Sequence, residues 1–335
     1  MQSQWGGNLH FEGCLSDKTS YYENFDRVDV DCGRSAIQYI AEIENKKNIY
    51  LPVYDCPLVN KRMEEAFCKA GVKIHYYNMD ESFRPILSNE MSDALILFVN
   101  YFGVMSDSLI DEMTAMQSDS VSVIIDNIPG YFETPRNGVY NIYSCRKFIG
   151  VPDGGHVIKN GIIKNNLETI ENSARYEYLL KSVNVGSNDS YDLYEMSEDM
   201  FTESNKPLGM SRLTSEILKT VDYERIKTRR LENFARLHQL LGEKNSFPVI
   251  SEFAKKPAFV YPLLVTDNGV NVRKKLVENN IYVSTLWRHV MTNEKANDFE
   301  KSLANNIVPL PIDQRYSVKD MEDMAAIVIN ILKEG

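Results

Sequence analysis

The chain has 335 residues, of which 43% are apolar and 25% are charged, and its net charge is −10 with histidine neutral. This composition is typical of a globular protein and excludes a mainly disordered, collagenous or coiled-coil chain. The excess of acidic residues argues against a surface that binds nucleic acid or an anionic membrane. The length predicts two domains and a substantial core.

The number and spacing of the cysteines predict a reducing compartment. The five cysteines are an odd number without a Cys-x-x-Cys pair, and the five histidines are dispersed. A disulfide framework, a structural zinc site or another metal is therefore not expected. Residues 1–10 lack the pattern of a signal peptide, and apolar runs such as 94–99 are too short to span a bilayer. We expect a cytoplasmic protein without a membrane segment.

The N-terminal half alternates between helices and short apolar strands. Residues 1–30 have no clear period, and we interpret them as an irregular arm. The following elements are predicted in chain order: helix 35–44, strand 49–54, helix 59–70, strand 72–77, strand 94–100, helix 109–116 and strand 121–125. Such alternation is typical of βαβ units in a parallel sheet that is covered on both faces.

The C-terminal half predicts more helix and then a smaller α+β domain. The predicted elements are helix 167–183, a polar loop over 186–207, helix 211–241 with a possible break near Asp222, strand 259–265, helix 271–279, strand 282–287 and helix 318–332. We therefore expect a large domain over residues 1–212. Residues 213–335 are expected to form a long linker helix and a small C-terminal domain.

Two residues after the predicted strands could carry chemistry. Asp126 ends an apolar strand, and ligands of parallel sheets bind beyond the carboxyl ends of the strands. Lys147 lies close to Ser144 and a glycine-containing run at 150–155. Pyridoxal phosphate requires a lysine for an imine, a carboxylate for its ring nitrogen and groups that bind phosphate. The alternative is a turn-capping Asp126 and a solvated Lys147, and spacing alone favours that alternative.

Gly33, Arg34 and Ser35 precede or open the first predicted helix. A glycine and a serine at a helix N-terminus can bind a phosphate, because backbone N–H groups and the helix dipole face it. The alternative is an ordinary N-terminal cap, of which every α/β protein has several.

Taken together, these segments resemble the DegT/StrS-type aminotransferases, the sugar aminotransferase branch of the fold-type I pyridoxal phosphate enzymes. The matching segments are 32–37, 51–54, 98–103, 124–127, 144–147, 153–155, 210–211, 308–313 and 320–321. The resemblance implies an α/β fold of fold-type I. Its large domain would hold a mixed, mostly parallel sheet between helices, followed by a smaller C-terminal α+β domain.

The resemblance also implies a role for each matching residue. Lys147 would hold pyridoxal 5′-phosphate as an internal aldimine and move a proton, and Asp126 would pair with the ring nitrogen. The cofactor-binding residues would be Gly33, Arg34, Ser35, Tyr54, Cys56, Asn100, Asp126, Ser144 and Lys147. Tyr54 or Cys56 would lie over one ring face, and Ser144 would help to bind the phosphate. Arg288 in the small domain is a candidate contact for a substrate anion, with a surface role as the alternative.

The sequence departs from the family pattern at several positions. Pro129 replaces a glutamine that usually lies beneath the ring, and Ser144 replaces a histidine before the lysine. An Asn-Tyr-Arg motif that reaches the partner subunit is not recognisable, since 204–206 is a poor match. Cys145 lies near the predicted cofactor lysine, but no paired histidine that would activate it is expected. These changes indicate a divergent subgroup.

The activity that the resemblance implies is transfer of an amino group from an amino acid such as glutamate to a keto sugar, with a nucleotide-linked sugar favoured. It also implies a homodimer with shared active sites, and the arm 1–30 and the loop 186–207 are candidate interface segments. Two alternatives remain. One is another pyridoxal phosphate reaction on the same scaffold, and the other is a binding or regulatory protein that has lost the chemistry.

Overall fold

A computed structural model describes residues 5–6, 19–57, 59, 61–87, 91–164, 166–170, 173–186, 189–200, 204–248 and 256–334. Within these ranges, no helix is both long and apolar enough to cross a membrane. The same ranges contain no group of three or more His, Cys, Asp or Glu side chains arranged to hold a metal ion.

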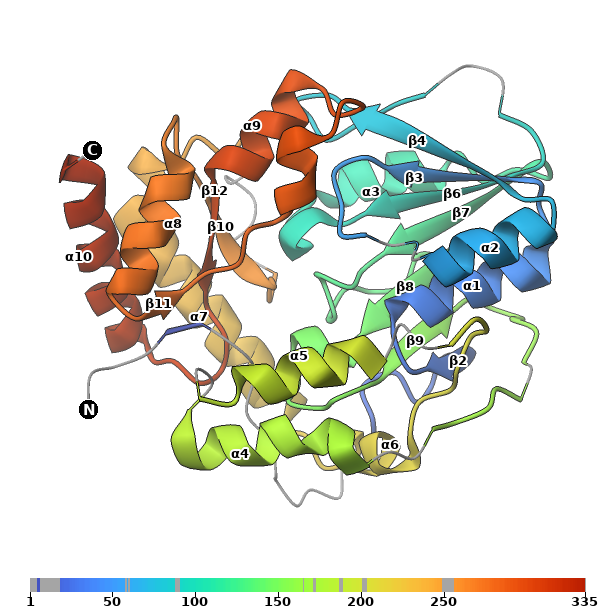
Figure 1. The fold of residues 1–335 in the computed structure, drawn as a ribbon, viewed down its shortest axis with the longest axis horizontal. Helices are drawn as coiled ribbons and strands as arrows, with labels where there is room; N and C mark the ends of the chain where they lie inside the picture. The colour runs from blue at the N-terminus through green and yellow to red at the C-terminus, as the bar shows by residue number, and fades with distance from the viewer. Residues whose placement is uncertain are drawn as a thin grey trace.

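An eight-stranded sheet forms the centre of the larger domain, in the order β2-β9-β8-β7-β6-β3-β4-β5 (Figure 1). Its strands are β2 (Arg27–Val30), β3 (Asn48–Pro52), β4 (Lys73–Met79), β5 (Pro85–Ile86), β6 (Ala94–Val99), β7 (Val121–Asp126), β8 (Tyr140–Ser144) and β9 (Gly155–Ile158). The pairs β2–β9, β8–β9 and β4–β5 are antiparallel, and the other four pairs are parallel. The expected mixed, mostly parallel sheet is confirmed.

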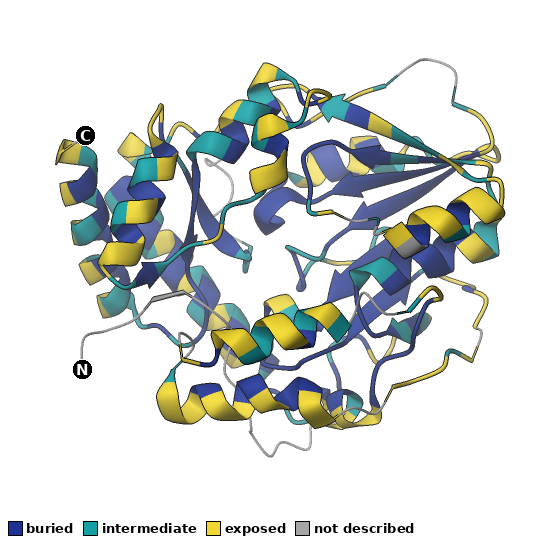
Figure 2. Cartoon of the chain, in the orientation of Figure 1, coloured by how far each residue is buried: buried dark blue, intermediate teal, exposed yellow. Residues whose placement is uncertain are grey.

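The central strands are apolar along their whole length because both faces of the sheet are covered. Every residue of β6 and β7 is buried, as the dark strands in Figure 2 show. Helix α1 (Gly33–Glu44) packs against β8 and β9, and α3 (Asp107–Thr114) packs against β7. Helix α2 (Lys61–Lys69) connects β3 to β4. These crossovers bring the carboxyl ends of the parallel strands to one edge of the sheet.

The smaller domain lies beside the sheet (Figure 1) and contains an antiparallel strand pair. Its elements are β10 (Val260–Leu264), α8 (Gly269–Glu278), β11 (Ile281–Tyr282), α9 (Asp298–Asn306), β12 (Ile307–Pro311) and α10 (Val318–Glu334). Helices α6 (Arg212–Leu218) and α7 (Tyr223–Leu241) lead into it. Strand β1 (Trp5–Gly6) pairs with β11, so these first residues join the small domain. The boundary at 212–213 stays a prediction.

Several sequence-based boundaries were wrong. The arm 1–30 contains β2, whose four residues are too few to display a period. The helix predicted from 167 begins later, as the 3-10 turn Ser173–Tyr176 and α4 (Glu177–Val185), because Thr169 is held in a β-bridge with Gly209. The strand predicted over 282–287 is reduced to β11.

The segment 186–207 is not all loop, because it contains α5 (Tyr191–Asp199). Its sequence is polar and acidic, which predicts a loop, whereas in the structure the ring of Tyr194 packs against Tyr178 of α4, with centroids 5.4 Å apart. The break predicted near Asp222 is confirmed, because the Asp222 side chain caps α7 by accepting from the N–H of Arg225.

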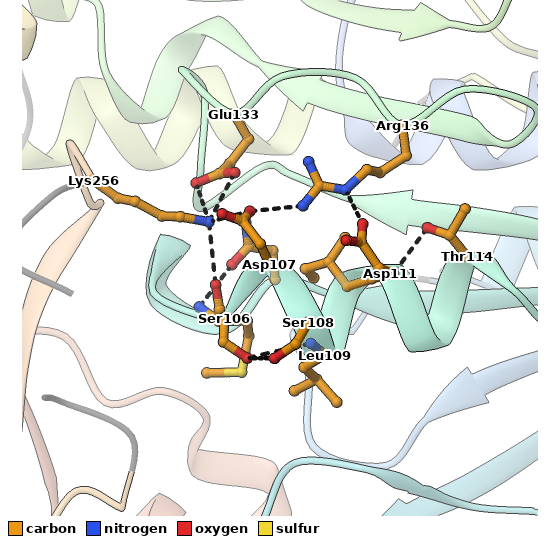
Figure 3. Close-up of polar contacts among 12 residues, drawn as sticks. Ser106, Asp107, Ser108, Leu109, Asp111, Thr114, Glu133, Arg136 and Lys256 are labelled. Atoms are coloured by element: carbon orange, nitrogen blue, oxygen red, sulfur yellow. Dashed lines mark hydrogen bonds and ion pairs between the residues drawn. The ribbon is translucent and has the colours of Figure 1, made fainter. Parts of the chain in front are cut away.

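Lys256, just before β10, connects the small domain to the large one through ion pairs (Figure 3). Its Nζ lies 3.0 Å from Asp107 and 3.1 Å from Glu133. Arg136 extends the network to Asp107 and Asp111, at 2.7 and 2.8 Å. Burial raises the pKa of Glu133 even though Lys256 opposes the shift. The charged form of Glu133 therefore depends on the lysine.

Replacing Lys256 with methionine is expected to lower the free energy of unfolding by about 1–2 kcal/mol, because a nearly buried carboxylate would lose its cation. Glu133 is only 12% exposed. Urea denaturation measures the change. Lys319→Met is the control, since Lys319 pairs with Asp323 on the exposed face of α10 and its loss should change little. Equal destabilisation by both variants would contradict the prediction.

Candidate active site

Several of the residues predicted from the sequence lie at the carboxyl edge of the sheet. Asp126 is the last residue of β7 and Ser144 is the last residue of β8. Asn100 follows β6, and Tyr54 and Asp55 follow β3. Because these four strands are mutually parallel neighbours, their ends open toward the same space.

The Asp126 carboxylate is buried and accepts one hydrogen bond from the described residues. It is 3% exposed, and its Oδ1 accepts a hydrogen bond from the N–H of Ile128 at 2.7 Å. No other hydrogen bond to this carboxylate comes from the described residues. Burial raises its pKa to about 7, although the Ile128 N–H and the charge of Lys147 both oppose the shift. A cation beside this buried carboxyl group would stabilise its charged form.

Lys147 ends the 3-10 turn Cys145–Lys147, which begins directly after β8. Its side chain is exposed, and its charge lowers the pKa of Asp55, Cys56 and Asp126 against the effect of burial. The amine therefore belongs to the same electrostatic cluster as Asp126. Its Nζ lies 5.6 Å from the centre of the Phe259 ring, which comes from the small domain.

Buried Arg230 of α7 supports this turn. Its guanidinium donates to the carbonyl oxygens of Ala258 and Phe259, both at 3.0 Å, and to that of Lys147 at 3.4 Å. It also stacks over the ring of Phe148 at 4.3 Å. The lysine backbone is thus fixed to the small domain while its amine remains accessible.

The N-terminus of α1 faces the loop after Asp126. A Cβ on Gly33 would lie 2.4 Å from Cδ1 of Ile128, so a side chain here would displace the isoleucine. The hydroxyl of Ser35 accepts from the N–H of Leu208 at 3.2 Å and is therefore already engaged. Arg34 lies close enough to lower the pKa of Cys56. Gly33 and Arg34 remain as candidate phosphate contacts at this helix end.

Tyr54 and Asn100 hold loops together. The Tyr54 hydroxyl donates to the carbonyl of Leu286 at 2.7 Å, and its ring packs edge-on against Trp287 at 4.9 Å. The Asn100 side chain donates to Asn127 at 3.0 Å and accepts from the N–H of Met105 at 3.1 Å. Both residues are fully buried, so their visible function is support of the site.

Cys56 and Ser144 lie at this edge of the sheet, and Arg288 lies in the small domain next to Trp287. Cys56 is partly exposed and close to the charges of Asp55 and Lys147. The hydroxyl of Ser144 has no hydrogen-bond partner in the part of the chain that the structure describes. Arg288 is exposed, directly after Trp287, and thus lies at the edge where the small domain meets Tyr54.

Sequence reasoning missed the histidine that contacts Cys145. His156 of β9 places Nε2 3.6 Å from Cys145 Sγ, and its Nδ1 lies 2.7 Å from Asp29 of β2. The antiparallel pairing of β8 with β9 creates this contact, which no local pattern reveals. Both side chains are buried, and burial raises the pKa of the Cys145 thiol. A buried, protonated thiol is a packing group rather than a nucleophile.

A cavity of about 480 Å³ lies beside Lys147, between the two domains. Its aromatic lining residues are Tyr178, Tyr191, Tyr194, Phe259 and Tyr282. An ion pair between Arg146 and Glu198 connects α5 to the turn that carries the lysine. The helix that the sequence did not predict therefore forms one wall of the cavity.

The comparisons with known proteins agree with this architecture. The chain matches no family model and no curated protein sequence. In structure it is similar to sugar aminotransferases of the DegT/DnrJ/EryC1/StrS type. The resemblance inferred from the sequence, and with it an α/β fold of fold-type I, is confirmed at the level of the fold.

Three solved structures illustrate the likeness. A DegT DnrJ EryC1 StrS aminotransferase from Brucella abortus is 14% identical, with a TM-score of 0.59 over 92% of this chain and 87% of that one. The aminotransferase TlmJ from Streptoalloteichus hindustanus is 14% identical, with a TM-score of 0.63 over 92% and 86%. PseC from Helicobacter pylori, an aminotransferase of pseudoaminic acid biosynthesis, is 11% identical, with a TM-score of 0.63 over 98% and 100%.

Proposed function

We propose that this protein is a pyridoxal phosphate-dependent aminotransferase. It would move an amino group from an amino acid, with glutamate as the first donor to test, to a nucleotide-linked keto sugar. The observation that carries the proposal is the buried carboxylate of Asp126 within the electrostatic reach of the accessible amine of Lys147. The fold of sugar aminotransferases supports it, and a structurally similar protein from Streptococcus pneumoniae has been solved in PLP and PMP forms.

The residues of the site fit the cofactor. When bound, pyridoxal phosphate accepts electrons from the substrate carbon. Asp126, with one oxygen open, would hold a proton on the ring nitrogen. Lys147 would attach the cofactor and later move a proton to and from the substrate carbon through Nζ. The Ser144 hydroxyl and the backbone N–H groups of Gly33 and Arg34 would bind the phosphate.

An absorbance spectrum of the protein with added pyridoxal phosphate tests this proposal. A band between ~400 and ~430 nm that borohydride converts to a stable adduct on Lys147 would support it. Peptide mapping identifies the modified residue. No band and no adduct would favour the alternative, a binding or regulatory protein with the same fold.

The cavity beside Lys147 is the proposed acceptor site. Its tyrosine rings can stack on the faces of a sugar or base, and Tyr191 and Tyr194 already lie 5.9 Å apart between ring centres. Ser284 and the cations of Arg146 and Arg230 add polar groups to the lining. The acceptor would thus lie between α5 and the small domain.

Replacing Tyr194 with alanine is expected to raise the KM for the keto-sugar acceptor about tenfold with little change in kcat, because a stacking contact is lost in ground and transition states alike. Steady-state kinetics with the acceptor as the varied substrate measure this split. Tyr76→Ala is the matched control, since this exposed tyrosine of β4 is not among the residues that line the cavity. A fall in kcat at unchanged KM would contradict the assignment.

We further propose that the protein is a cytoplasmic homodimer. Apolar side chains exposed on α4 and α5 support a protein contact in this region, which includes the predicted interface segment 186–207. They are Leu180, Val183, Val185, Tyr191 and Met196. The predicted arm lies mostly outside the described residues. A monomer mass by light scattering at micromolar concentration would contradict the dimer.

A further inference from the structure

Asp55 is a buried acid to which the proposed function assigns no role. It follows β3 and is 5% exposed. Its Oδ1 accepts from the N–H of the next residue, Cys56, at 2.6 Å. Its Oδ2 is buried and has no hydrogen-bond partner among the described residues. A buried carboxylate oxygen without a hydrogen bond destabilises the folded protein. Such an oxygen therefore generally has a hydrogen-bond partner in another state of the same protein.

Asp55 faces the same centre as Asp126. Only β6 separates the strands that carry them. Burial and the charge of Asp126 raise the pKa of Asp55, while the N–H and the thiol of Cys56 and the charge of Lys147 oppose the shift. The titratable and charged groups around this pair come from six elements or their ends. They are Tyr54, Cys56, Tyr77, Tyr101, Lys147, Arg34 and Glu300.

Two neighbouring buried carboxyl groups rarely ionise together, because each charge opposes the other. A ligand that brings one cationic ring nitrogen satisfies one of them. Asp126, at the end of β7 and with one oxygen open, is the partner of that nitrogen in the proposed function. The second acid then remains neutral, and a neutral carboxyl group has an O–H that can donate.

We propose that Asp55 is a second acid of the cofactor site, which keeps its proton at neutral pH and donates a hydrogen bond to an oxygen of the bound cofactor. This inference rests on the proposed function and adds a residue to it. It explains why the Oδ2 atom has no partner among the residues that the structure describes. It also predicts that an amide can replace the acid, because the side-chain NH₂ of asparagine donates from a similar position.

Binding of pyridoxal 5′-phosphate to the cofactor-free protein, measured by absorbance titration from pH 6 to pH 9, tests the donor role. Asp55→Ala is expected to raise the dissociation constant about tenfold at pH 7, whereas Asp55→Asn should stay within about twofold. The wild-type to Asn ratio of dissociation constants should rise with pH, because an ionised Asp55 no longer donates. Groups that titrate in both proteins affect both dissociation constants, so their effect cancels in this ratio.

Glu42→Gln is the control, since this acid on the outer face of α1 also has a pKa raised by desolvation but lies away from the strand ends. It should leave the dissociation constant unchanged at each pH. Asp55→Ala binding as tightly as wild type, or Asp55→Asn binding as weakly as Asp55→Ala, would overturn the inference alone. Failure of the wild-type protein to bind the cofactor would overturn the proposed function and this inference together.

Thermal unfolding without cofactor tests the protonation separately. An unfolded aspartate ionises near pH ~3.9, whereas the folded protein holds the proton of Asp55 to higher pH. Rising pH therefore favours the unfolded wild-type chain, and Asp55→Asn should melt at a higher temperature than wild type at pH 8. The difference should vanish near pH 4. Equal melting temperatures at pH 8 would contradict a retained proton, and they would do so whether or not the cofactor binds.

Discussion

Replacing Lys147 with alanine is expected to remove the absorbance band between ~400 and ~430 nm and to lower transamination by at least about 10³-fold. The amine is the accessible cation of the cluster that contains Asp55 and Asp126. Its loss removes the attachment point and the base in one step. Absorbance spectra and single-turnover rates of the purified variant measure the two losses separately.

Two further variants separate covalent attachment from charge. Lys147→Arg keeps a cation near Asp126 but cannot form the imine, so it should be as inactive as the alanine variant. Lys159→Ala removes a lysine that pairs with Glu44 and stacks over Tyr140, away from the strand ends, and should retain the band. Near-normal turnover of Lys147→Ala would show that the lysine is misassigned.

Four of the parallel strands, β3, β4, β6 and β7, could be predicted from the sequence because their signals are local. The continuous apolar runs of β6 and β7 indicate strands that are buried on both faces of the sheet. Asp126 ends the second run at its last position. Strand β8 was not predicted, and its parallel pairing with β7 places its end next to Asp126. Lys147 ends the short turn that follows this strand.

The contacts that depend on pairing could not be predicted in the same way. His156 reaches Cys145 because β9 returns antiparallel to β8, and the short strands involved carry no distinctive pattern. Asp55 follows the apolar strand β3, but no local pattern shows that one of its oxygens lacks a partner among the described residues, because this depends on three-dimensional packing. Helix α5 was not predicted because its composition is polar and acidic, and its contact with α4 through Tyr194 and Tyr178 is visible only in three dimensions.

Replacing Asp126 with asparagine is expected to lower the transamination rate about 10²- to 10³-fold, because a neutral amide no longer stabilises a proton on the ring nitrogen. Position and size of the side chain are conserved, so the N–H of Ile128 can still donate to the remaining oxygen. Single-turnover kinetics with the amino donor measure the effect. Near-normal rates would mean that another group holds the nitrogen.

The Asp126→Asn variant should be more stable than wild type without cofactor but should gain less stability when the cofactor binds. Burial raises the pKa of Asp126 to about 7, above its unfolded value of ~3.9. Wild-type stability without cofactor therefore falls as pH rises from ~4 to ~7, and Asp126→Asn should melt higher than wild type at pH 8. Saturating cofactor should raise the melting temperature of wild type more than that of the variant, because the ring cation stabilises the charged carboxylate. Equal shifts in both proteins would show that Asp126 does not face the cofactor, even if the rate has fallen.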